Sequence, residues 1–201
     1  MNFLSIDCST EIGSLFIKSK SKTYSRIIQI DKSNNDLLMK CILDFFAEEG
    51  LTFDDILNIF VNQGPGSFSG LRGSLSIAKG ISLSKNKNLY GYNTFLWSCT
   101  KFFNKEDFIY SIIKFREKYF IKCFNKSLEN SFRVEEITEE NIIRNYAKKI
   151  KIIPKNISKY FSKKILDLNN LSLVDLDHNE LEFLQLKGLL DKSIVRPLYL
   201  T

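Results

Sequence analysis

The sequence has little of the material from which most catalytic sites are built. Its 201 residues include one histidine, one tryptophan, three prolines and four cysteines. With His178 alone, neither a histidine-based metal site nor a Ser-His-Asp triad has enough ligands or bases. No two cysteines form a Cys-x-x-Cys pair, which argues against a zinc site. We therefore expect free thiols in a reducing compartment and no metal centre.

Long hydrophobic runs are also missing. No apolar stretch approaches the roughly 20 residues that a membrane-spanning helix needs. Asp7 interrupts the first apolar run, where a signal peptide requires a continuous one. We expect a cytoplasmic protein with no membrane contact. The composition, 44% hydrophobic and 26% charged, is that of a globular chain with one large domain or two small ones.

Positive charge is unevenly distributed along the chain. The net charge is +1 for residues 1–100 and +5 for residues 101–201. Residues 144–164 carry eight Lys or Arg and no acid, and isoleucines and aromatic residues lie between these cations. Two interpretations remain open for this segment: a solvated amphipathic stretch, or a surface that faces nucleic acid.

Strand-like and helix-like segments alternate in the first half. A capping box at Ser33–Asp36 predicts a helix that ends near Gly50, and Thr52 opens a second, short helix. Alternating apolar residues predict a hairpin over residues 107–125, which suggests a domain boundary near residues 100–106. Pro197 predicts an extended tail. We further expect strands over residues 3–6, 12–18, 23–30 and 58–62, and helices over residues 94–103 and 136–146.

A glycine-rich turn lies between an expected strand and an expected helix. It consists of Gly64, Pro65, Gly66, Ser67, Phe68, Ser69 and Gly70, with Leu71 and Arg72 already in the helix. Such a turn can present backbone N–H groups to an anion, or can allow two segments to pack closely. It is not a Walker A loop, because the Gly-Lys-Ser/Thr ending is absent.

Three segments together resemble a known family. They are Asp7-Cys8-Ser9-Thr10 after the first strand, the glycine-rich turn, and the tail Val195-Arg196-Pro197-Leu198-Tyr199-Leu200. Their order and spacing resemble the TsaB (YeaZ) family, whose glycine motif reads GPGSFTGLR. Only Ser69 departs from that motif, and it keeps the hydroxyl. The resemblance is strong over residues 1–98 and weak over residues 107–190.

The resemblance implies an α/β fold of the actin/Hsp70/sugar-kinase (ASKHA) type. It has two related lobes, each with a mixed sheet and flanking helices, here over residues 1–100 and 101–201, and the second lobe is reduced. Asp7, Ser9 and Thr10 match the turn that holds ATP phosphates and magnesium in active members. For this chain the resemblance implies a vestigial site, with no cofactor in the isolated chain and ATP/Mg only in a complex.

The implied function is that of a non-catalytic scaffold that binds TsaD. The complex transfers a threonylcarbamoyl group to the adenosine next to the anticodon of tRNA, and a TsaE-like ATPase takes part. TsaD carries a His-x-x-x-His metal motif, and this chain has Ser33 to Leu37 in that neighbourhood. Contact with tRNA through the complex, and a homodimer when the chain is alone, are further expectations.

The family pairs with TsaD through the first helix and the helix after the glycine motif. Small residues on the second helix favour close helix packing. The alternative is that both helices pack only on the chain's own sheet. The expected interface residues are Leu37, Leu38, Cys41, Phe45, Gly70, Leu71, Gly73, Ser74, Ile77 and Ala78.

Two other functions remain open. Asp7-Cys8-Ser9-Thr10 is compatible with an independent ATP-dependent kinase of the same superfamily. However, Lys114-Phe115-Arg116 stands where the family's second lobe has Asp-Ala-Arg, so the expected carboxylate is missing there. The basic segment at residues 144–164 is compatible with a stand-alone RNA-binding protein, which would bind tRNA with a steep salt dependence.

Overall fold

The chain forms two compact units. The computed structural model describes residues 1–29, 37–129, 132–192 and 195–200. The first unit consists of Met1–Thr94 and Leu190–Thr201, and the second of Phe95–Leu189. The expected division after residue 100 is therefore wrong in two ways: the first unit ends earlier, and the C-terminal segment returns to it. Backbone hydrogen bonds hold this segment, from Leu198 N to Gln63 O (2.7 Å) and between Gly91 and Asp191.

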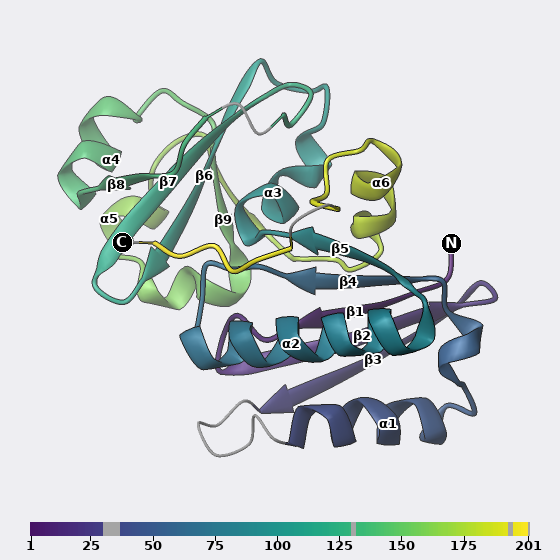
Figure 1. Ribbon diagram of the computed structural model, residues 1–201. Coiled ribbons are helices and arrows are strands. Elements are labelled where there is room, and N and C mark those ends of the chain that lie inside the picture. Colours follow the sequence, from purple (N-terminus) through teal and green to yellow (C-terminus); the bar gives the residue numbers. More distant parts are fainter. Residues whose placement is uncertain (30–36, 130–131, 193–194, 201) are drawn as a thin grey trace. The chain divides into compact units, whose positions relative to one another are not determined.

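The first unit contains a five-stranded mixed sheet in the order β3-β2-β1-β4-β5 (Figure 1). Strand β1 pairs antiparallel with β2 and parallel with β4, and β4 pairs parallel with β5. The elements are β1 (Phe3–Asp7), β2 (Ile12–Ser19), β3 (Lys22–Gln29), α1 (Leu38–Glu48), η2 (Phe53–Asp55), β4 (Asn58–Asn62), α2 (Phe68–Lys85) and β5 (Asn88–Tyr92).

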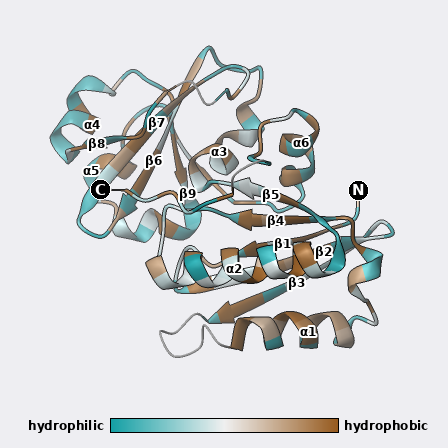
Figure 2. Ribbon diagram, viewed as in Figure 1, coloured by the Kyte–Doolittle hydropathy of each residue, from teal (hydrophilic) through white to brown (hydrophobic). Residues whose placement is uncertain are grey.

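Alternation along the strands separates two buried faces of this sheet. Leu4 and Ile6 belong to one core cluster with residues of α1 and α2, so both helices cover the same face. On the opposite face, Phe3 packs against Phe60 with ring centroids 4.8 Å apart. Figure 2 shows the resulting hydrophobic colouring of β1 and β4. Burial on both faces explains why the apolar residues of these short strands point to both sides of the sheet.

Local signals explain the ends of the first helices. Gly50 follows α1 with φ of +64°, the left-handed conformation that favours glycine after a helix. Thr52 and Asp55 form a capping box around η2, as expected. The expected capping box at Ser33–Asp36 lies outside the described residues.

The second unit repeats the strand order of the first. Its sheet runs β10-β9-β6-β7-β8, with β6–β7 and β7–β8 antiparallel and β6–β9 and β9–β10 parallel. This confirms two related lobes. Helix α3 (Thr94–Cys99) begins at the last residue of the first unit and continues into the second. The other elements of the second unit are η3 (Thr100–Phe102), β6 (Phe108–Phe115), β7 (Lys118–Asn125), β8 (Glu135–Ile137), α4 (Glu139–Asn145), β9 (Lys151–Pro154), η4 (Lys155–Tyr160), α5 (Lys163–Leu166), β10 (Leu171–Val174) and α6 (Glu180–Leu186).

The helix expected over residues 136–146 is shorter than predicted. Residues 135–137 pair with β7 as strand β8, and α4 begins only after Thr138, whose side chain caps Asn141 N at 3.3 Å. Threonine is a good N-cap and a poor helix-interior residue, which places the helix start there. The basic segment at residues 144–164 is not one amphipathic stretch but spans β9, η4 and the start of α5. Of its eight cations, only Lys151 is buried.

Candidate functional site

The turn after β1 is held by the carboxylate of Asp7. Asp7 Oδ1 accepts hydrogen bonds from Ser9 N at 2.9 Å and from Asn62 Nδ2 at 3.1 Å. Thr10 Oγ1 donates to the carbonyl of Ile12 at 2.6 Å. Burial raises the pKa of the Asp7 carboxyl, and the hydrogen bonds from Ser9 and Asn62 oppose that rise. The predicted trio Asp7, Ser9 and Thr10 thus forms one turn whose named polar groups bind within the chain.

Asn62 is the central polar residue of the site, and the sequence reasoning missed it. Its side chain is fully buried at the end of β4. Its Nδ2 lies 3.0 Å from Thr94 Oγ1 and 3.4 Å from Ser9 Oγ, and its Oδ1 accepts from Gly64 N at 2.8 Å. The available signal was a polar residue that ends an apolar strand beside β1, where parallel strands bring their carboxyl ends together.

The glycine-rich turn packs directly against the turn after β1. A Cβ on Gly66 would lie 2.1 Å from Ser9 O, and one on Gly70 would lie 2.3 Å from Cys8 O. Ser67 N donates to Ser9 O at 2.8 Å, which joins the two turns. Both glycines are needed because the backbones approach too closely for any side chain.

Four backbone donors of this turn, including that of Ser67, are used inside the chain. Gly64 N binds Asn62 Oδ1, Leu71 N binds Ser67 O, and Gly70 N binds Ser67 Oγ at 3.4 Å, the N-cap contact of α2. Close packing therefore accounts for the glycine-rich sequence without a ligand. Nucleotide binding at Asp7–Thr10 stays a prediction. Of the other turn residues, Pro65 is buried, while Phe68, Ser69 and Arg72 are exposed.

The structure divides the expected interface residues into two groups. Leu37 is exposed, and Cys41, Gly73 and Ile77 are half-buried. The other six face the interior of the first unit and are not available to a partner in this arrangement. Each helix must bury one face on the sheet, and the sequence pattern selected that apolar face instead of the outer one. The six buried residues are Leu38, Phe45, Gly70, Leu71, Ser74 and Ala78.

The outer face of α2 combines small and apolar residues. Ser69, Ser76, Gly80 and Leu83 are exposed, and Leu83 is 85% exposed. Positions 69, 73, 76, 80 and 83 follow the four–three spacing of a helix-packing seam. This face, not the buried one, is open to another helix.

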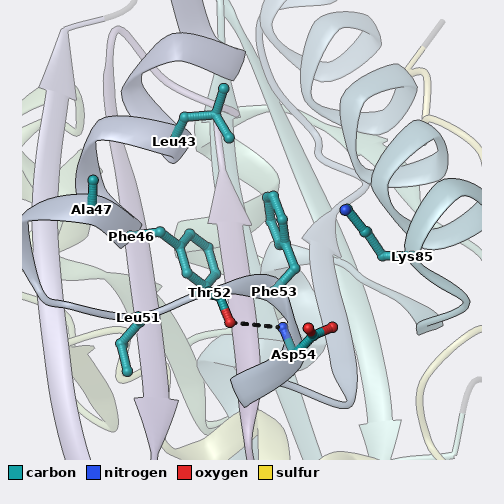
Figure 3. Close-up of a pocket in the computed structure, with 8 residues that line it drawn as sticks. All are labelled: Leu43, Phe46, Ala47, Leu51, Thr52, Phe53, Asp54 and Lys85. Atoms are coloured by element: carbon teal, nitrogen blue, oxygen red, sulfur yellow. Dashed lines mark hydrogen bonds between the residues drawn. The ribbon is translucent and has the colours of Figure 1, made fainter.

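A small pocket of about 260 Å³ lies between α1, η2 and the last residue of α2 (Figure 3). Residues of α1, η2 and the end of α2 surround it, and Leu43 and Lys85 come from the two longer helices. Thr52 Oγ1 accepts a hydrogen bond from Asp54 N at its base. The full lining is Leu43, Phe46, Ala47, Leu51, Thr52, Phe53, Asp54 and Lys85.

The cysteines are free thiols, as expected. Cys8 and Cys99 are buried, and Cys41 and Cys123 are half-buried. Burial raises the pKa of Cys8, and it raises the pKa of Cys99 to about 12, so neither is a ready thiolate. Within the described ranges, no group of three or more His, Cys, Asp or Glu residues is arranged to hold a metal ion. No helix among the described residues is long and apolar enough to cross a membrane.

Comparison with known proteins first defines the fold class. The chain superposes on YeaZ from Pseudomonas aeruginosa with a TM-score of 0.70, 17% identity and 99% coverage of both chains. It also superposes on a Bacteroides thetaiotaomicron protein described as having an actin-like ATPase fold, with a TM-score of 0.55, 10% identity and coverage of 91% and 95%. The protein therefore has an actin-like fold with two related α/β lobes, in agreement with the repeated strand order.

Sequence similarity to curated proteins covers less than half of the chain. A segment of 85 residues is 34% identical to the tRNA threonylcarbamoyladenosine biosynthesis protein TsaB of Buchnera aphidicola subsp. Baizongia pistaciae, covering 41% of this chain and 38% of that relative. The Escherichia coli protein of the same name is 25% identical over 96 residues, covering 48% and 42%. The family model "TsaD: tRNA N6-adenosine threonylcarbamoyltransferase" matches residues 29–108.

These findings make the chain TsaB/YeaZ-like. The matched segments span about two fifths of the length of the curated TsaB relatives. The family-model match at residues 29–108 includes the glycine-rich turn and both helices that cover one face of the first sheet.

Proposed function

We propose that this chain acts in tRNA threonylcarbamoyladenosine biosynthesis as a non-catalytic subunit that holds a TsaD-like transferase. The observation that carries the proposal is the likeness of a segment of 85 to 96 residues to TsaB proteins, together with the YeaZ-like fold. The internal use of the Asp7 carboxylate and of the glycine-turn donors supports a role in architecture over one in chemistry.

The proposed contact surface is the outer face of α1 and α2. Leu37, the residue before α1, and Leu43 within α1 are about half exposed. On α2 the exposed residues of this surface are Ser76, Gly80 and Leu83. Small residues let a second helix approach closely, and the flanking leucines supply apolar area. This surface replaces the buried residues of the original expectation and keeps Leu37, Cys41, Gly73 and Ile77 at its edge.

The test is a binding measurement with the TsaD-like subunit of the same organism. We expect a complex by size-exclusion chromatography, and we expect Ser76→Arg to weaken it by at least about tenfold because the new side chain blocks close helix approach. Ser25→Arg is the matched control, since Ser25 is also exposed and lies on β3.

Four results would contradict the proposal or a part of it. Absence of any complex with the unchanged chain would remove the scaffold role. A complex that tolerates Ser76→Arg as well as Ser25→Arg would place the interface elsewhere. Threonylcarbamoyl transfer by the chain alone would overturn its non-catalytic character, and tRNA binding by the chain alone would favour the RNA-binding alternative. A TsaE-like ATPase and ATP/Mg belong to the complex in this proposal.

A further inference from the structure

Three exposed side chains from distant segments form an ordered cluster at the start of α2. Phe68 opens the helix and is 52% exposed, and Tyr199 in the C-terminal tail is 47% exposed. Their ring centroids lie 5.6 Å apart. The guanidinium carbon of Arg72 lies 4.0 Å from the centroid of the Phe68 ring, and Arg72 Nε donates to Tyr199 OH at 3.0 Å. We call these three residues the Phe-Arg-Tyr cluster.

The tail is fixed in place independently of the cluster. Leu198 N donates to Gln63 O at 2.7 Å, and Gln63 Nε2 donates to Arg196 O at 2.9 Å. Gln63 itself is buried at the end of β4. Tyr199 is thus presented beside α2 by main-chain and amide hydrogen bonds, and not by the burial of its own ring.

The guanidinium of Arg72 is held in one orientation, but Tyr199 uses only one of its hydrogen-bond donors. A guanidinium carries five N–H donors, and the contact with Tyr199 uses the one on Nε. Within the part of the chain that the structure describes, no carboxylate lies within ion-pair distance of Arg72. The two terminal NH2 groups of the guanidinium can therefore donate to both oxygens of a carboxylate, and the two rings hold the guanidinium in one orientation before binding.

We propose that the Phe-Arg-Tyr cluster binds an acidic segment of the protein partner, with an Asp or Glu carboxylate on Arg72 and an apolar side chain against the rings of Phe68 and Tyr199. Arginine and aromatic residues dominate the binding energy of protein interfaces. The cluster also continues the outer face of α2, because Arg72 and Ser76 are one helical turn apart. For the identity of the partner, the inference rests on the proposed function.

Charge favours a protein segment over RNA as the occupant. Strong binding to RNA requires several cations that neutralise successive phosphates. The cluster has one cation, and residues 1–100 carry a net charge of only +1. Along α2 the other cations are Lys79 and Lys85, two or more turns away from Arg72.

The experiment measures the dissociation constant of the complex with the TsaD-like subunit by calorimetry. We expect Arg72→Gln to weaken binding by at least about tenfold, and Arg72→Lys to restore only part of it because lysine lacks the planar fork. Tyr199→Phe removes the hydroxyl that orients Arg72 and should weaken binding a few fold, roughly the effect of one hydrogen bond. Raising the salt concentration should reduce the difference between the unchanged chain and Arg72→Gln.

Arg26→Gln is the matched control. Arg26 also lies over an aromatic ring, that of Phe45 at 4.8 Å, but its guanidinium is already paired with Glu48. We expect this variant to bind as the unchanged chain does, and thermal unfolding should show that all variants remain folded. A complex that forms normally with Arg72→Gln overturns the inference and leaves the proposed function intact.

Two further outcomes separate the possibilities. Absence of a complex with the unchanged chain refutes the proposed function and, with it, the partner named here. Salt-sensitive tRNA binding by the isolated chain that Arg72→Gln abolishes assigns the cluster to RNA, and overturns the inference in favour of that occupant.

Discussion

The two units share one strand order but differ in the connections between strands. In the first unit the residues between β1 and β2 form the Asp7–Thr10 turn, whereas β6 and β7 are joined by Arg116 and Glu117 alone. In the first unit β4 leads through the glycine-rich turn to an α2 of 18 residues. In the second, β9 leads directly to η4 and then to an α5 of 4 residues. The sheet is common to both units, and the candidate site and binding surface belong to the connections of the first.

Asp7 in the first unit and Lys151 in the second are buried charged side chains that are accommodated in opposite ways. Asp7 receives neutral donors from Ser9 and Asn62, and burial raises its pKa. Lys151 at the start of β9 donates to the carbonyls of Tyr146, Ala147 and Lys149 at 2.8, 3.1 and 2.6 Å. Burial lowers the pKa of Lys151. The carboxylate is only partly compensated, whereas the ammonium has a partner for each of its three donors.

The largest effect is expected where the two turns of the first unit meet. Gly66→Ala places a Cβ 2.1 Å from the backbone oxygen of Ser9, so we expect a loss of about 3 to 4 kcal/mol in the free energy of unfolding. Urea denaturation measures it. Gly80→Ala is the control: its Cβ meets nothing within 4 Å, and alanine should stabilise the helix by up to about 1 kcal/mol. Equal effects for the two variants would show that the turns are not in tight contact.

The second effect belongs to the second unit and depends on pH. Burial lowers the pKa of His178 from 6.5 to about 4, and its ring packs on Trp97 with centroids 4.8 Å apart. The unfolded chain binds this proton more readily, so stability is full above pH 6.5 and falls as the pH drops towards 4. The loss should be up to about 3 kcal/mol, measured by urea denaturation at several pH values.

The fluorescence of Trp97 reports directly on the protonation of His178, because the chain has one tryptophan and one histidine. A protonated imidazole in contact with an indole quenches its emission, so fluorescence should fall with a midpoint near the histidine pKa of about 4. His178→Phe keeps a ring against Trp97 and should abolish this step. A midpoint near pH 6.5 would mean that the imidazole is solvated and the packing is looser than described.

The smallest effects are expected for substitutions of Lys151 and Asp7, whose changes in stability should have opposite signs. Lys151→Met should destabilise the chain by about 2 kcal/mol, because three carbonyls lose the donor that Lys151 supplies. Asp7→Asn should stabilise it at pH 7 by on the order of 1 kcal/mol, because the amide oxygen keeps both hydrogen bonds without burying a charge. A carboxyl with a raised pKa costs stability only where it ionises, so this gain should vanish below the ordinary carboxyl pKa. Thermal unfolding at pH 7 and pH 3 measures both variants, and changes of the same sign at pH 7 would refute the contrast.

The sequence was most informative where local chemistry decides structure. The strands of the first sheet, the end of α1 at Gly50 and the hairpin at Arg116 were predicted from apolar alternation and turn residues. The helix that begins after Thr138 was predicted to start two to three residues too early, because the acidic residues on both sides of Thr138 are compatible with either a strand or a helix. Asn62 was missed, because a sequence alone does not distinguish a buried asparagine from an exposed one.

The sequence by itself determined the strand and helix pattern, the scarcity of metal ligands and the resemblance of its first half to TsaB. Only the tertiary structure decided which face of each helix is buried, so Leu38 and Phe45 belong to the core while Ser76 and Leu83 face outward. The tertiary structure also shows that the C-terminal tail packs in the first unit and that Tyr199 lies beside Arg72. The physical reason is the same in each case: periodicity defines an apolar face, but only the sheet and tail that pack against a helix determine which surface remains for a partner.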